Sequence, residues 1–247
     1  TQTIDQFPLD NIEYCHDEMW RNYVRGTLQC LRQHNNEFSG MNLYIAGNVP
    51  QGAGLSSSAS FEIALLKTVT DLYSLDLGGV DAALIGQAAE NSFVGCNCGI
   101  MDQLVSAMGL ENHAMVLDCR DLSIKDAPIP EGTAILVVNS NVKRGLVDSE
   151  YNSRRSQCEI VAQILGVAAL RDLSVSQLQN AKLLLTDEQF RRARHVITEN
   201  DRTMDAMAAM QANDLTRLGQ LMAESHASLR DDYQVSTAEL DGLVEIM

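Results

Sequence analysis

The stretch Pro50-Gln51-Gly52-Ala53-Gly54-Leu55-Ser56-Ser57-Ser58-Ala59-Ser60 decides how the first half of the chain folds. Before it, Asn42–Gly47 alternates apolar and polar side chains, which predicts a strand. After it, apolar residues recur at helical spacing from Ser58 to Tyr73. The stretch is therefore predicted to be a glycine-rich loop that joins a strand to the start of a helix.

This loop has the composition of a phosphate-binding site. Gly52 and Gly54 permit positive φ, and the N-terminus of the following helix offers unpaired N–H groups and a partial positive charge. The serine triplet adds hydroxyl groups, one of which could ligate Mg²⁺. A Walker loop would end in Gly-Lys-Ser/Thr, and a Rossmann loop would need glycine at position 57, which is serine. A plain turn that caps the helix is the alternative, but the serine triplet favours a polyphosphate.

The composition is that of a globular protein. The 247 residues are 45% hydrophobic and 21% charged, enough for one large domain or two ordinary ones. The net charge of −15 opposes binding to nucleic acid or to an anionic membrane, and nothing indicates an obligate protein partner. The six cysteines form no regular framework, and no secretory segment or long apolar run is present. We interpret them as reduced thiols of a cytoplasmic protein.

The remaining periodicity predicts an α+β fold with two domains. The first domain, residues 1–128, is expected to hold a mixed sheet, and the second, residues 129–247, to be rich in helices. A continuous apolar run within Thr133–Ser140 predicts a strand buried on both faces. The other predicted elements are a strand at 114–118 and helices at 11–36, 82–93, 99–108, 148–165, 174–180, 187–212, 214–226 and 236–247.

Three further side chains are candidates for chemistry. Asp102 is a carboxylate among apolar neighbours, which is costly unless it is paired or functional, although it could simply cap a helix. Glu90 lies in a predicted helix and, taken alone, is a solvated acid. Tyr151 combines an apolar face with a hydrogen-bonding hydroxyl, which suits a sugar ring, but a core tyrosine at a domain junction explains it equally well.

Taken together, these motifs resemble the galactokinases of the GHMP kinase superfamily in order and in spacing. The loop resembles the second motif of the superfamily, and the segment from Ala89 to Asp102 resembles the galactokinase segment that carries two functional acids. The stretches Asn139–Arg144, Ser149–Arg155 and Leu221–Tyr233 also look like galactokinase, so the resemblance runs over nearly the whole chain.

The resemblance implies a role for each candidate. The residues Gly52, Ala53, Gly54, Leu55, Ser56, Ser57 and Ser58 would wrap the phosphates of ATP. Ser58 and Glu90 would share Mg²⁺, Tyr151 would hydrogen-bond the sugar, and Asp102 would face its anomeric hydroxyl, either as a base or as an orienting group.

The implied function is ATP-dependent phosphorylation of D-galactose at its anomeric hydroxyl. The alternatives are an N-acetylgalactosamine or arabinose kinase and a non-catalytic galactose-sensing regulator, and the intact pair Ser58-Ala59 favours an enzyme. The sequence contains neither the N-terminal sugar motif nor the C-terminal glycine-rich motif of the family. We therefore expect an internal portion of a longer protein, with both domains incomplete and with no activity on its own.

Overall fold

The structure is a computed structural model that describes residues 3–34, 37–140 and 147–247, with side chains from residue 152 onward in the last range. It divides into two compact units. The first unit consists of residues 1–111 and 117–124, and the second of residues 112–116 and 125–247. The domain boundary between residues 128 and 129 stays a prediction.

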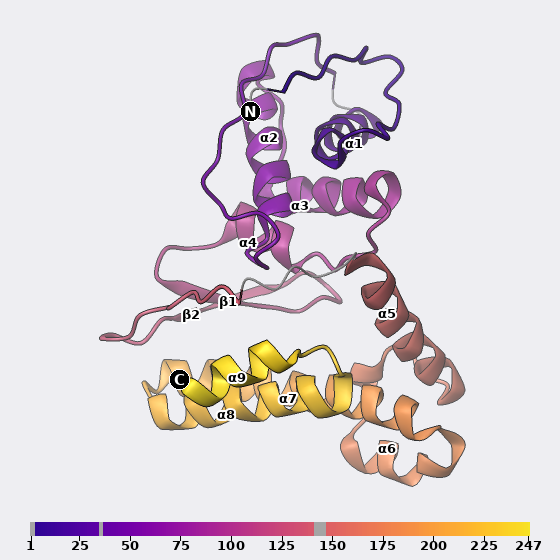
Figure 1. The fold of residues 1–247 in the computed structure, drawn as a ribbon, viewed down its shortest axis with the longest axis vertical. Coiled ribbons are helices and arrows are strands. Elements are labelled where there is room, and N and C mark those ends of the chain that lie inside the picture. The colour runs from indigo at the N-terminus through magenta and orange to yellow at the C-terminus, as the bar shows by residue number, and fades with distance from the viewer. Residues whose placement is uncertain (1–2, 35–36, 141–146) are drawn as a thin grey trace. The chain divides into compact units, whose positions relative to one another are not determined.

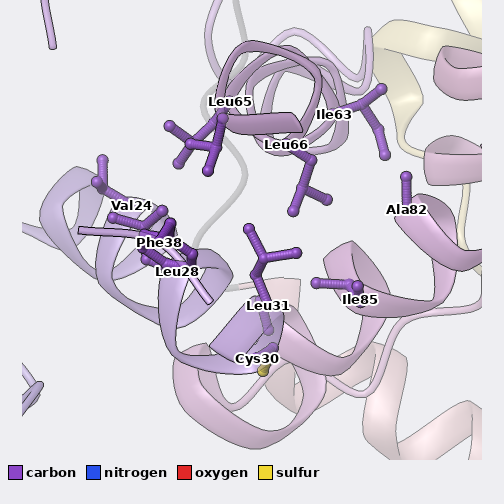
Figure 2. Packing of buried hydrophobic residues seen from close by; sticks show 12 residues of the cluster. Val24, Leu28, Cys30, Leu31, Phe38, Ile63, Leu65, Leu66, Ala82 and Ile85 are labelled. Atoms are coloured by element: carbon purple, nitrogen blue, oxygen red, sulfur yellow. The ribbon is translucent and has the colours of Figure 1, made fainter. Parts of the chain in front are cut away.

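The first unit is built from helices that share one apolar core. They are α1 (Met19–Gln33), α2 (Ser57–Tyr73), α3 (Gly79–Ala88), the π-helical η1 (Ala89–Val94) and α4 (Met101–Met108). Leu31 of α1, Leu66 of α2 and Ile85 of α3 are buried and point toward one another (Figure 2). Burying a side chain of this size stabilises a fold by roughly 1.5–3 kcal/mol, so this contact fixes α2 against its neighbours.

A smaller apolar cluster of the first unit includes residues of α3, of α4 and of the segment Leu117–Ile124. Ile100 and Leu104 are buried together with Ala83 of α3, and Ile124 packs against them. The sheet has two strands, β1 (His113–Leu117) and β2 (Ile124–Pro128) (Figure 1). A bond from the Asp118 N–H to the Ser123 carbonyl, at 2.9 Å, closes the hairpin. The predicted strand at 114–118 is thereby confirmed.

Two other strand predictions are wrong for the described residues. Asn42–Gly47 and Thr133–Ser140 run without regular secondary structure, because neither finds a partner strand in the part of the chain that the structure describes. Tyr44 is 90% exposed, and Ile135, expected to be buried on both faces, is 77% exposed. The predicted mixed sheet is therefore a single hairpin here, although the α+β class holds.

The second unit is almost entirely helical, as its periodicity predicted. Its elements are α5 (Val147–Ile164), η2 (Leu170–Asp172), α6 (Val175–Asn180), η3 (Lys182–Leu184), α7 (Asp187–Gln211), α8 (Leu215–Ser228), η4 (Leu229–Tyr233) and α9 (Ala238–Ile246) (Figure 1). Capping boxes begin two of them, because Ser174 pairs with Gln177 before α6 and Thr186 pairs with Gln189 before α7. Val161, Leu178 and Phe190 lie in the core beneath these helices.

A buried polar network fastens η4 to α7. Arg192 is 1% exposed, and its guanidinium donates hydrogen bonds to four acceptors: Gln157, Glu188, Gln234 and the carbonyl oxygen of Asp232. His195 shares a 2.9 Å hydrogen bond with the Ser228 hydroxyl and stacks on the Tyr233 ring. Such a network fixes one arrangement of the helices because each buried charge has its partners.

Within the described residues, all six cysteines are free. None of the helices there combines the length and the apolarity that crossing a membrane requires.

Candidate functional site

The backbone of the predicted phosphate loop is left-handed at three positions. Gly52 has a φ of 68° and Gly54 a φ of 70°, a region that residues with a side chain rarely adopt. Ser56 also lies there, with a φ of 52°, which is uncommon for serine. A Cβ atom added at either glycine would meet no described atom within 4 Å. The two glycines are therefore required by the left-handed backbone of the loop and not by close packing.

The N-terminus of α2 is left open by this loop. The hydroxyl of Ser56, its N-cap residue, accepts no capping hydrogen bond within the described structure. The caps of α6 and α7 do accept such bonds. Backbone N–H groups of a first helical turn have no intrahelical acceptor, and here the serine hydroxyls lie beside them partly exposed. Donors of this kind next to left-handed residues suit an anion such as a phosphate group.

Glu90 is buried rather than solvated. It lies in η1 with 6% of its surface exposed, so the interpretation as a surface acid is wrong. The N–H groups of Gly95 and Cys96 both donate to its backbone carbonyl, at 2.8 and 2.9 Å. These bonds hold the turn after η1 in place, and π-helical turns often occur at functional sites.

Two residues that the sequence analysis passed over surround Glu90. Glu62 of α2 is 0% exposed and Gln103 of α4 is 1% exposed. The Gln103 amide nitrogen lies 3.4 Å from Glu62 Oε2 and 3.3 Å from Glu90 Oε1. Glu62 could have been noticed, because Ser58, Glu62 and Leu66 follow one another at four-residue intervals and therefore share the buried face of the helix.

Burial determines the protonation of this cluster. It raises the pKa of Glu62 to about 9, and the nearby Glu90 acts in the same direction, while the hydrogen bond from Gln103 opposes them. Burial and the charge of Glu90 also raise the pKa of the Cys98 thiol to about 12. Near neutral pH, Glu62 is therefore a neutral acid and Cys98 a thiol, so the cluster offers oxygen ligands rather than a thiolate.

Asp102 directly precedes Gln103 of this cluster, in the first turn of α4. The N-cap residue of that helix is Ile100, with no side-chain cap, so Asp102 does not cap the helix. Its carboxylate is partly exposed, whereas the next residue, Gln103, is buried. A carboxylate in the first turn is favoured by the helix dipole and, at this exposure, is open to a ligand.

Tyr151 falls in α5, and its side chain lies outside the described part of the chain. Its predicted contact with the sugar stays a prediction.

Of the two predicted metal ligands, Ser58 lies one turn before Glu62 in α2, and Glu90 is linked to Glu62 through Gln103. Ser58 and Glu62 share a face of α2, and the Gln103 amide joins Glu62 to Glu90. In the residues the structure describes, no three His, Cys, Asp or Glu side chains gather as a metal cage. Mg²⁺ does not need one, since it keeps waters and takes most of its other ligands from phosphates. One serine hydroxyl and one carboxylate therefore fit this ion.

Comparison with known proteins places the first unit near one family. Residues 22–110 match the family model for the GHMP kinases N terminal domain, a range that includes the loop, Glu90 and Asp102. The chain also resembles the crystal structure of Lactococcus lactis galactokinase complexed with galactose, with a TM-score of 0.86 and 33% sequence identity. The match covers 97% of this chain and 64% of the galactokinase. Residues 22–110 are therefore similar to the GHMP kinase N-terminal domain, and the chain as a whole has a galactokinase-like fold.

Proposed function

We propose that the complete protein is a galactokinase, which transfers the γ-phosphoryl group of ATP to the anomeric hydroxyl of D-galactose and forms galactose 1-phosphate. One observation carries the proposal. An uncapped helix N-terminus, preceded by left-handed glycines, leads along one helix face to a buried acid cluster beside Asp102. The chain spans 64% of the galactokinase it matches, so the activity is proposed for the whole protein.

Phosphoryl transfer demands positioning and charge stabilisation more than covalent chemistry. In the proposed site, the N–H groups and hydroxyls of Gly52–Ser58 bind the ATP phosphates. Ser58 and Glu90 would hold Mg²⁺, and the bound ion would supply positive charge beside the phosphate oxygens. The Asp102 carboxylate accepts the hydrogen bond of the anomeric hydroxyl and turns its oxygen toward the γ-phosphorus. Tyr151 supplies a ring face and a hydroxyl to the sugar.

The charge and composition of the chain extend the proposal to its surroundings. A net charge of −15 disfavours nucleic acid and anionic membranes as partners, and it does not exclude the proposed partners, ATP and a small sugar. We place the protein in the cytoplasm, where its six free thiols would stay reduced.

A coupled ADP-release assay tests the proposed function. The protein would be expressed from its complete open reading frame and given ATP, Mg²⁺ and one sugar at a time: D-galactose, N-acetylgalactosamine, arabinose or glucose. We expect turnover with D-galactose above all, and a sugar 1-phosphate as the product in phosphorus NMR. The 247-residue chain is expected to be inactive in the same assay.

The outcomes separate the alternatives. Faster turnover of N-acetylgalactosamine or arabinose would make the protein a related sugar kinase and overturn the galactose assignment. Galactose binding in calorimetry without turnover of any sugar would indicate a sensing regulator, and the kinase proposal would then fail.

A further inference from the structure

Gln103 occupies the centre of the buried acid cluster. It is 1% exposed, and its amide nitrogen lies 3.3 Å from Glu90 Oε1, 3.4 Å from Glu62 Oε2 and 3.9 Å from the Cys98 sulfur. An amide nitrogen carries two hydrogens, and these can be donated to the two carboxyl groups at once. No apolar side chain of this size could hold both acids.

The packing leaves this amide little freedom to move. A Cβ atom added at Gly86 of α3 would lie 3.1 Å from the Gln103 Cγ atom and 3.4 Å from Glu62 Oε2. The glycine therefore lets α3 approach both side chains closely. Glu62 is 0% exposed, so it cannot turn outward and release its end of the bridge.

The cluster is only partly satisfied by its own members. Glu62 Oε1 and Gln103 Oε1 are buried and lack a hydrogen-bond partner in the described residues. A buried acceptor without a partner costs about 1–3 kcal/mol.

Gln103 also connects Glu90 to the helix that carries Asp102. The two residues are neighbours in the first turn of α4, with Asp102 partly exposed and Gln103 buried. A rigid helix transmits the position of one to the other. The amide therefore relates the carboxylate of η1 to the carboxylate that would face the substrate.

We propose that Gln103 is a positioning residue, which holds the Glu90 carboxylate for the metal and fixes it relative to Asp102. This proposal rests on the proposed function, because it takes Glu90 to be a Mg²⁺ ligand. Glu62 serves as the anchor of the same amide. Residues that orient a metal ligand typically affect metal affinity by about 10–100-fold, and we assign Gln103 to this group.

The test measures metal binding apart from turnover. Mn²⁺ replaces Mg²⁺ as the probe, and electron paramagnetic resonance follows its binding to the complete protein with a non-hydrolysable ATP analogue and without sugar. Gln103→Met keeps the size of the side chain and removes both donors, so we expect Mn²⁺ affinity to fall about tenfold or more. In the ADP-release assay, the same variant should need about tenfold more Mg²⁺ for half-maximal rate.

A second amide in the same region provides the matched control. Gln87 of α3 donates to the Cys98 carbonyl at 3.1 Å, and no bond from its amide to either acid is present in the described structure. Gln87→Met should leave Mn²⁺ affinity unchanged. If Gln103→Met does not fold, Glu62→Met replaces it, because this change keeps the size of the side chain and removes the acceptor that anchors the bridge. We expect a several-fold loss of Mn²⁺ affinity for that variant.

The outcomes distinguish this inference from the proposed function. Unchanged Mn²⁺ affinity and Mg²⁺ requirement in a folded Gln103→Met protein would overturn the positioning role while the kinase proposal stood. Equal losses in the Gln87 and Gln103 variants would also overturn it, since they would reflect general loosening of the fold. Wild-type protein that binds no Mn²⁺ with the nucleotide analogue would remove the metal site itself.

Discussion

The two units each bury ionisable side chains, but these side chains differ in how fully they are hydrogen-bonded. In the second unit, Arg192 is enclosed with four hydrogen-bond acceptors on three elements. In the first unit, Glu62 and Gln103 are equally buried, yet each keeps one oxygen without a partner in the described residues. A network with full hydrogen bonding rigidifies a fold, whereas one with orphaned atoms costs free energy.

We infer that the Arg192 network serves structure, and we propose that the Glu62–Gln103–Glu90 cluster serves function. Removing a member of the Arg192 network should destabilise the second unit, while removing a member of the Glu62–Gln103–Glu90 cluster should change chemistry more than stability.

The largest expected effect is on turnover. Asp102→Asn keeps the size of the side chain and removes its charge, so kcat should fall about 10³-fold, or about 4 kcal/mol in the activation barrier. Binding of the ATP analogue in calorimetry should survive, because the loop is intact. Asp81→Asn, an exposed acid in the first turn of α3, is the control and should keep normal turnover. Near-normal activity of Asp102→Asn would show that Asp102 has no catalytic role in the first unit.

The next effect is on the stability of the second unit. Arg192→Met removes a buried guanidinium and leaves its acceptors unpaired, so the free energy of unfolding should fall by about 3 kcal/mol. Hydrogen exchange measured by mass spectrometry over α7 and η4 reports this loss directly. Arg191→Met is the matched control, since its neighbouring guanidinium donates a 3.3 Å bond to the Asp231 carbonyl from a less buried position. Equal exchange in both variants would show that the Arg192 network adds no special stability.

The sequence alone predicted the helices of both units well and the sheet poorly. Helical periodicity is local, so α2, α6 and α7 lie within one or two residues of the ranges expected for them. A strand depends on a distant partner, which local patterns at Asn42–Gly47 and Thr133–Ser140 could not supply.

The candidate site was predicted only where its residues resemble a motif. Glu90, Asp102 and the loop were named from the sequence, but their burial was not. Gln103 was not predicted, although it directly follows Asp102, because an uncharged amide does not by itself indicate a catalytic or metal-binding role. Its role depends on contacts with residues 13 and 41 positions away, which no local pattern reveals.

The third prediction concerns pH and the first unit. The pKa of Glu62 is about 9 in the folded protein and near 4.5 when unfolded. Between these values, the folded state keeps a proton that the unfolded state has released, so the free energy of unfolding falls as pH rises. The slope can reach about 1.4 kcal/mol per pH unit. Glu62→Gln should therefore gain stability over the wild type as pH rises from about 6 to 8.

The sole tryptophan, Trp20, lies in α1 of the first unit, and its fluorescence during urea unfolding measures this difference. A stability difference between variant and wild type that stays constant with pH would show that Glu62 is ionised in the folded state. The first unit would then bury a charged carboxylate at Glu62, as the second unit buries the charged Arg192.

The smallest expected effect concerns the second unit. Here the free energy of unfolding falls as pH falls, whereas in the first unit it falls as pH rises. Burial lowers the pKa of His195 below its ordinary value of 6.5, and the ring is held neutral between Ser228 and Tyr233. Below pH 6.5 the unfolded chain takes up a proton before the folded one, so stability falls as pH falls until the folded pKa is reached. His195→Gln should lose less stability than the wild type between pH 6.5 and 5, by at most about 1.4 kcal/mol per unit. Urea unfolding followed by circular dichroism gives the difference at each pH. A difference that does not change with pH would mean that the ring accepts a proton within the network, and that the second unit is less rigid than its hydrogen bonds imply.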